Sequence, residues 1–189
     1  MTGLSFSLQA VSPLQVGVIF FASLTAAVWD LASRRIPNWL TFPMLATGLV
    51  WSAWMGGPMG FVGALAASAL LAAPYVLLFL YAGGGGGDVK LMAAIGAWAG
   101  LVPGLVVLVL VALCGVVMGV VVALAKGQLR TTMNRVTAAA YSAVPTGGVL
   151  PSISKIIPMD KEKMQPMPYG LAIFAGVCLA TVGVLIWRP

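Results

Sequence analysis

The chain has 189 residues, of which ten are Lys or Arg, four are Asp or Glu, and 61% are hydrophobic. Charged residues make up 7% of the sequence, whereas soluble domains carry about 25%. This composition excludes a soluble globular enzyme, a disordered chain and a typical nucleic-acid-binding protein, and it leaves a polytopic membrane protein. The chain has no His, and its two Cys lie in apolar runs without CxxC spacing. We therefore expect no metal site and no disulfide framework.

Charge-free runs predict an all-α protein with six transmembrane helices, at about 13–32, 39–56, 60–81, 88–101, 103–125 and 168–187. A spanning helix needs about 20 apolar residues, so the breaks at Met55–Pro58 and at Pro103-Gly104 divide the longest runs. The helix at 88–101 is short for a span, and it either crosses part of the bilayer or starts deep within it. Residues 126–167 are expected to form a cytoplasmic loop in a single membrane-embedded domain, 1–189.

The basic residues predict the orientation of the chain. With six spans and the N-terminus outside, nine of the ten basic residues lie on the inner side and only Arg188 lies outside. This asymmetry follows the positive-inside rule, so we expect a multi-pass protein of the cell inner (cytoplasmic) membrane with both termini outside. The net charge of +6 is then a topology signal and does not indicate a nucleic-acid partner. The basic segment 126–163 is suited to contact with anionic lipids.

Two of the four acidic residues occupy unusual places. Asp160 and Glu162 alternate with Lys in a polar loop, which is typical of a solvated surface, whereas Asp30 ends a charge-free run over 1–29. Asp88 follows five consecutive glycines and begins an apolar helix. Ionisable side chains near the hydrocarbon are costly and usually face a polar cavity or a partner. Because the predicted topology places Asp30 and Asp88 at the same membrane face, they can meet across the bundle.

A pair of carboxylates supports one specific chemistry. Like charges that lie close together do not easily both ionise, so the pair shares one proton. The ionised member can then draw a proton from water while the protonated member polarises a peptide carbonyl, as in aspartic proteases. The preceding glycines would let a substrate backbone come close. Simpler explanations stand beside this one, because Asp30 could pair with Arg34 at i+4 and Asp88 could cap its helix.

Three other functions fit parts of the sequence. A proton-coupled transporter or channel subunit would use Asp30 and Asp88 as proton sites, although both acids are expected near one membrane face. A structural subunit of a secretion complex would need neither acid. A Ser–Lys peptidase using Ser154 and Lys155 is a remote option, because no signature surrounds these two residues.

Three segments together resemble the type IV prepilin peptidases. Asp30 with the following Arg35-Ile36-Pro37-Asn38 resembles their first signature, and Gly85-Gly86-Gly87-Asp88-Val89-Lys90-Leu91 resembles the second, of the GxGD type. Met167-Pro168-Tyr169-Gly170-Leu171-Ala172 is similar to the Pro-aromatic-Gly stretch that opens their last helix. The three segments occur in the family's order and on matching sides of the predicted membrane.

This resemblance implies an aspartic endopeptidase that removes a short basic leader from prepilins or prepilin-like proteins at the cytoplasmic face. Such enzymes typically cut after a Gly, just before the hydrophobic helix of the pilin. The resemblance implies Asp30 and Asp88 as the catalytic pair. It also implies that a further set of residues shapes the active-site loops or positions the substrate: Arg35, Pro37, Asn38, Gly85, Gly86, Gly87 and Lys90.

The sequence departs from the larger, bifunctional members of that family. Those members begin with a cytoplasmic domain that carries paired CxxC motifs and is associated with N-methylation, and only residues 1–12 precede the first helix here. We therefore expect neither methyltransferase activity nor a cofactor. The compact form resembles the peptidases of tight-adherence (Flp-type) pilus systems. Small residues four apart, such as Gly115 and Gly119, suit close helix contact, either within the monomer, which we favour, or at a homodimer seam.

Overall fold

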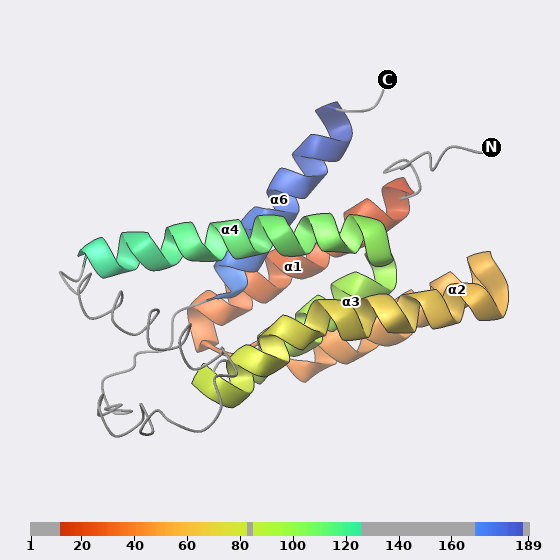
Figure 1. Ribbon diagram of the computed structural model, residues 1–189, viewed down its shortest axis with the longest axis horizontal. Helices are drawn as coiled ribbons and strands as arrows, with labels where there is room; N and C mark the ends of the chain where they lie inside the picture. The colour runs from red at the N-terminus through yellow and green to blue at the C-terminus, as the bar shows by residue number, and fades with distance from the viewer. Residues whose placement is uncertain (1–11, 83–84, 126–168, 187–189) are drawn as a thin grey trace, which may run out of the picture. The chain divides into compact units, whose positions relative to one another are not determined.

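The computed structural model describes residues 12–82, 85–125 and 169–186, and the ordered elements in these ranges are all helices (Figure 1). They are α1 (Pro13–Ser33), α2 (Asn38–Ala82), α3 (Gly86–Ala99), α4 (Leu101–Ala125) and α6 (Gly170–Ile186). The predicted all-α class is thus confirmed for the described residues. The cytoplasmic loop expected at 126–167 lies outside the described residues.

The chain divides into two units, and each is considered by itself. The first comprises Met1–Gly115 and Met167–Pro189, and the second comprises Val116–Pro166, of which only the end of α4 is described. All packing reported below lies within the first unit. The single-domain organisation expected for residues 1–189 stays a prediction.

Helix α1 has sequence signals at both of its ends. Ser12 is the N-cap, and its hydroxyl accepts a hydrogen bond from the Gln15 backbone N–H while the Gln15 side chain accepts one from the Ser12 N–H. This reciprocal capping box, with Pro13 in the first helical position, satisfies donors that a helix start leaves free. The helix ends at Arg34, whose φ of 52° is left-handed and whose backbone N–H donates to the Asp30 carbonyl.

Helix α2 folds back on itself, because Gly57 interrupts its 45 residues with φ 59° and ψ −152° (Figure 1). A positive φ costs glycine little, and the break falls within the predicted interruption at Met55–Pro58. The two limbs, 38–56 and 58–82, approach so closely that a side chain at Gly60 would collide with the Ser52 carbonyl. The predicted helices at 39–56 and 60–81 correspond to these limbs.

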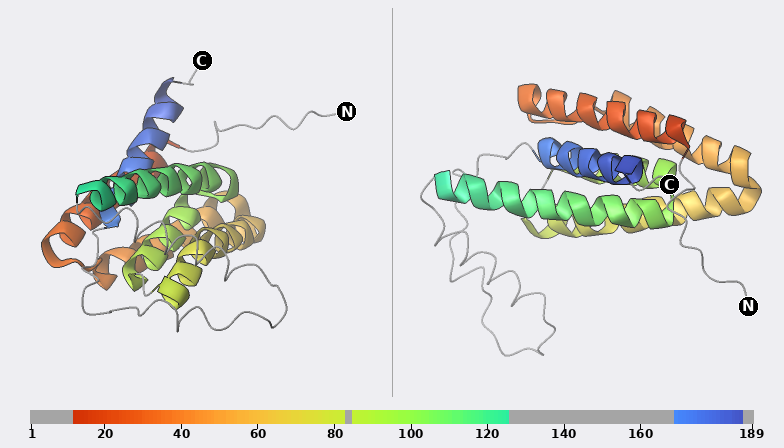
Figure 2. Two further views of the ribbon diagram at one scale, coloured as in Figure 1. Left: turned by 60° about the vertical axis from the view of Figure 1, so that its left-hand side comes forward. Right: turned by 90° about the horizontal axis from the view of Figure 1, so that it is seen from above.

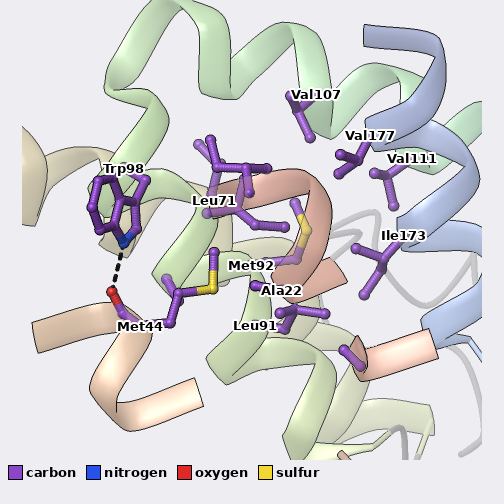
Figure 3. Close-up of a cluster of buried hydrophobic side chains, with 14 of the residues drawn as sticks. Ala22, Met44, Leu71, Leu91, Met92, Trp98, Val107, Val111, Ile173 and Val177 are labelled. Atoms are coloured by element: carbon purple, nitrogen blue, oxygen red, sulfur yellow. Dashed lines mark hydrogen bonds between the residues drawn. The ribbon is translucent and has the colours of Figure 1, made fainter. Parts of the chain in front are cut away.

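Helix α3 is the central element of the packed core, and every residue from Ala94 to Ala99 is buried. Around it pack apolar side chains from the other four helices (Figure 3). The largest fully buried members are Leu71, Leu91, Met92, Ile95, Val111, Ile173 and Val177. The helix begins at Gly86, so Asp88 lies within its first turn and does not open it as the sequence suggested.

Side chains from α1 and α2 satisfy the polar groups at the C-terminal end of α3. The Gln15 amide donates to the Trp98 carbonyl at 2.7 Å, and the Ser52 hydroxyl donates to the Ala97 carbonyl at 3.0 Å. The Trp98 indole N–H donates to the Met44 carbonyl at 2.8 Å (Figure 3). The last carbonyls of a helix lack intrahelical donors, and these contacts allow α3 to end inside an apolar bundle.

The outer surface of the helices is strongly apolar. Three helical segments are long and apolar enough to cross a membrane, namely Pro13–Ser33, Asn38–Leu80 and Leu101–Val122. Large hydrophobic side chains such as Phe21, Val50 and Val109 are more than half exposed. Contiguous exposed apolar surface of this kind is typical of contact with lipid. The chain therefore carries several candidate membrane spans.

Candidate active site

Asp30 is buried at the C-terminal end of α1, where its side chain is 7% exposed. Its Oδ2 atom accepts a hydrogen bond of 2.9 Å from the backbone N–H of Gly170, the first residue of α6. Helix α6 packs against α1, with the rings of Phe20 and Phe174 5.4 Å apart (Figure 2). Packing between two helices far apart in the sequence thus brings a helix start onto this carboxylate. The Arg34 side chain is exposed. The hydrogen bond between Arg34 and Asp30 joins their backbones, from the Arg34 N–H to the Asp30 carbonyl.

Asp88 is half-buried in the first turn of α3. Gly85 is the N-cap of this helix, and its carbonyl accepts a hydrogen bond of 3.2 Å from the Asp88 N–H. The Asp88 carboxylate folds back over Gly85, where an added Cβ would lie 3.0 Å from Oδ2. An acidic residue in a first helical turn is favoured by the helix dipole, so Asp88 also helps to start α3.

The segment between α1 and α2 contacts the start of α3 in two places. Ile36 is buried, and it lies against Gly87 so closely that a Cβ on Gly87 would be 2.8 Å from the Ile36 Cβ. The Lys90 ammonium donates to the Asn38 side-chain oxygen at 2.8 Å and lies 5.1 Å from the centre of the Phe42 ring. The first two sequence signatures therefore meet in the structure, and the segments that carry Asp30 and Asp88 are joined.

The other predicted site residues lie around these contacts. Arg35 is exposed, and Pro37 is half-buried with its carbonyl accepting hydrogen bonds from the N–H groups of the first turn of α2. Gly86 lies near the Phe79 ring. Within the described residues, no hydrogen bond brings the Arg35 or Pro37 side chain onto Asp30 or Asp88, and the role of these residues stays a prediction.

Two tyrosines near the aspartates were missed by the sequence reasoning as site residues. Tyr75, on the second limb of α2, is buried, and its ring meets that of Tyr169 edge-on with centroids 5.9 Å apart. Tyr169 directly precedes Gly170, whose N–H bonds to Asp30, so this aromatic pair lies next to the Asp30 carboxylate. Tyr169 belongs to the third signature, but Tyr75 follows Pro74 in an apolar helix and no local motif marks it.

The arrangement offers no group of metal ligands in the described ranges, where no cluster of three His, Cys, Asp or Glu side chains occurs. What it offers is a pair of carboxylates, one buried and one half-buried, at one end of a helical bundle. The fold and the site define a helical protein with candidate membrane spans and a carboxylate pair at the ends of two of its helices.

The comparison with protein families identifies the group to which this chain belongs. The Type IV leader peptidase family matches residues 17–120, more than half of the chain, and the chain belongs to this family. The matched region contains both Asp30 and Asp88.

Two curated proteins are similar to the chain over part of their length. It is 33% identical over 119 residues to a prepilin leader peptidase/N-methyltransferase of Neisseria gonorrhoeae, covering 59% of this chain and 42% of that protein. It is 35% identical over 113 residues to a prepilin leader peptidase/N-methyltransferase of Xanthomonas campestris pv. campestris, covering 54% and 38%. The matches thus span less than half the length of these relatives. No solved structure matches the chain.

Proposed function

We propose that the chain is an aspartic endopeptidase that removes the leader peptide from prepilins or prepilin-like proteins at the cytoplasmic membrane face. The observation that carries this proposal is that the segments holding Asp30 and Asp88, from two separate signatures, are joined through Ile36–Gly87 and Asn38–Lys90 in a chain of the Type IV leader peptidase family. The substrate class is carried over from the names of the two relatives. The proposal concerns the peptidase reaction alone.

In the proposed reaction, Asp30 and Asp88 share one proton and act on the scissile peptide from the same site. The ionised carboxylate takes a proton from a water molecule, which attacks the carbonyl carbon, while the protonated carboxyl donates a hydrogen bond to the carbonyl oxygen. The proton is then passed to the leaving amine, and the pair returns to its starting state. The glycines before Asp88 shape this loop, because Gly85 leaves room for the Asp88 carboxylate and Gly87 leaves room for Ile36.

The proposed topology has six spans, both termini outside and the site at the cytoplasmic side of the inner membrane. Gly57 supports it by splitting α2 into two antiparallel limbs, and the contacts of α3 and α6 place their N-terminal ends beside the C-terminal end of α1. The cations described at this end of the bundle are Arg34, Arg35 and Lys90. Since cytoplasmic loops are rich in Lys and Arg, this end is proposed to face the cytoplasm.

Aromatic side chains support the same placement. Trp29 and Trp39 are exposed and pack edge-on with ring centroids 5.7 Å apart, next to the Arg34-Arg35 segment. Exposed tryptophans are typical of the membrane–water interface. Asp30 then lies near the depth of that interface, where water can reach the site. The proposed partners are a prepilin and membrane lipid, and a homodimer stays a prediction.

The alternative of a proton-coupled transporter or channel has less support. A proton path needs titratable groups at several depths, and Asp30 and Asp88 are the only acidic residues in the described ranges. Both belong to the end of the bundle where the α1–α2 segment contacts α3, while the polar side chains at the other end of α3 are the neutral Gln15 and Ser52.

Co-expression with an Flp-type prepilin tests the proposal. We expect Asp30→Asn and Asp88→Asn each to abolish the change in gel mobility that follows leader removal, with both variants still inserted in the membrane. Asp160→Asn and Glu162→Gln are the matched controls and should process the prepilin normally. Full processing by either the Asp30 or the Asp88 variant would exclude this pair as the catalytic machinery.

A further inference from the structure

We propose that α6 positions the Asp30 carboxylate through the backbone N–H of Gly170, and that Tyr169 fixes the helix start which supplies this N–H. The inference deepens the proposed peptidase function and rests on it. It assigns a role to the third signature, Met167–Ala172, whose function the sequence alone did not indicate. Tyr169 and Gly170 are positioning residues in this proposal, because they act through Asp30.

The hydrogen bond itself joins a rigid donor to a buried acceptor. The Gly170 N–H donates to Asp30 Oδ2 at 2.9 Å, and Asp30 is 7% exposed. A backbone N–H has no rotamers, so it holds one carboxylate oxygen in a single place as long as α6 keeps its place. A catalytic carboxylate must be held within a fraction of an ångström of its productive geometry, and this bond supplies such a constraint.

The start of α6 is well suited to a carboxylate. The Tyr169 carbonyl accepts hydrogen bonds from the Ala172 and Ile173 N–H groups, so Tyr169 is the N-cap and Gly170 is the first helical residue. The first N–H groups of a helix have no intrahelical acceptor, and the helix dipole favours a negative charge there. Asp30 takes up one of these free donors.

Glycine at position 170 avoids a tight contact with Asp30. An added Cβ would lie 3.0 Å from both the Cβ and the Oδ2 atoms of Asp30. Any larger residue would therefore move the carboxylate or the first turn of α6 by a few tenths of an ångström. The missing side chain lets α6 approach α1 closely enough for the hydrogen bond.

Tyr169 holds this helix start from the other side. Its ring packs edge-on against that of Tyr75 of α2, with ring centroids 5.9 Å apart. It also lies against Gly115 of α4, where any side chain would overlap the Tyr169 ring. Helices α2 and α4 thus fix the N-cap of α6 independently of Asp30, and the N–H of the next residue is presented to the carboxylate.

Three glycine variants test this contact. Gly170→Ala adds a Cβ and keeps the N–H, whereas Gly170→Pro replaces the N–H by a ring carbon that points at Asp30 Oδ2. Proline is tolerated in the first helical position, and the extended backbone typical of an N-cap suits a residue that precedes proline. Gly183→Ala is the control, because position 183 on the same helix has open space around it.

For leader removal by the purified full chain, we expect kcat to fall about tenfold in Gly170→Ala and about 100-fold in Gly170→Pro, as for small misplacements of a catalytic group. The KM for prepilin should stay within about twofold, because substrate binding is not altered. Gly183→Ala should behave as the parent chain. A Gly170→Pro variant that is as active as Gly170→Ala would overturn the inference.

A stability cycle tests the same contact without using activity. In detergent, Gly170→Pro should melt at a lower temperature than Gly170→Ala when Asp30 is present. The two should melt together in an Asp30→Ala background, because no carboxylate remains to accept the bond. If the difference in melting temperature between Gly170→Pro and Gly170→Ala stayed the same in the Asp30→Ala background, the inference would be overturned. A parent chain that cleaves no prepilin would refute the peptidase function instead, while the cycle would still report on the hydrogen bond.

Discussion

The contact between Lys90 and Asn38 leads to a quantitative prediction about how the site is assembled. It joins the segment after α1 to the first turns of α3, and therefore joins the supports of Asp30 and Asp88. Three variants are needed: Lys90→Met, which keeps most of the side-chain stem, Asn38→Ala, and the double variant. If the contact holds the two segments in register, the two single changes should not act independently.

The size of the effect follows from the geometry. The hydrogen bond is 2.8 Å long but exposed, so solvent screening limits it to about 0.5–1 kcal/mol. The position of the ammonium 5.1 Å from the Phe42 ring centre adds about 0.5–1 kcal/mol at an exposed site. Lys90→Met loses both the hydrogen bond and the contact with the Phe42 ring, and Asn38→Ala loses only the hydrogen bond. Their coupling energy is therefore about 0.5–1 kcal/mol, or about two- to fivefold in kcat/KM.

The assay measures kcat/KM for leader removal by the four purified proteins in the same detergent. The double variant should be less impaired than the product of the two single effects, by about two- to fivefold. Lys90→Arg, which keeps the charge and the donors, should lose less activity than Lys90→Met. Strictly multiplicative losses in the double variant would refute the reasoning, since they would mean that Lys90 and Asn38 act separately.

Two further predictions concern stability, measured by unfolding in detergent. Ser52→Ala leaves a carbonyl at the end of α3 without its donor and should cost about 1–3 kcal/mol. Thr47→Val removes an exposed hydroxyl that bonds within its own helix and should change stability by less than about 0.5 kcal/mol. Gly96→Ala places a Cβ 2.7 Å from the Ala67 carbonyl oxygen and should destabilise the chain by about 1–3 kcal/mol. Gly63→Ala meets open space and should not. Equal losses of stability in Ser52→Ala and Thr47→Val, or in Gly96→Ala and Gly63→Ala, would contradict the packing described above.

Features set by local chemistry could be predicted from the sequence. The lack of charge indicated apolar helices, because a bilayer leaves few other ways to satisfy the backbone. The break near Gly57 was marked by a Gly-Gly-Pro run, since only glycine easily adopts the positive φ found there. Asp30 and Asp88 stood out because isolated acids are costly beside hydrocarbon.

Features that depend on tertiary packing could not be predicted in the same way. The hydrogen bond between Gly170 and Asp30 joins residues 140 positions apart, and no periodicity encodes such a pairing. Tyr75 lies in a uniformly apolar helix, and only the packing of its ring against Tyr169 reveals its place beside the site. The carbonyls at the end of α3 likewise find their donors on α1 and α2, which hydropathy does not reveal.

The central claim is that Asp30 and Asp88 cut the peptide together, and the single-turnover rate of leader release tests it most directly. The measurement uses purified protein in lipid with an excess of enzyme over prepilin, together with the Kd for prepilin. We predict that Asp30→Asn and Asp88→Asn each lower the rate by about 10⁴-fold or more and leave the Kd unchanged, while Asp160→Asn keeps the parent rate. A rate within about tenfold of the parent in either of the first two variants would contradict the account.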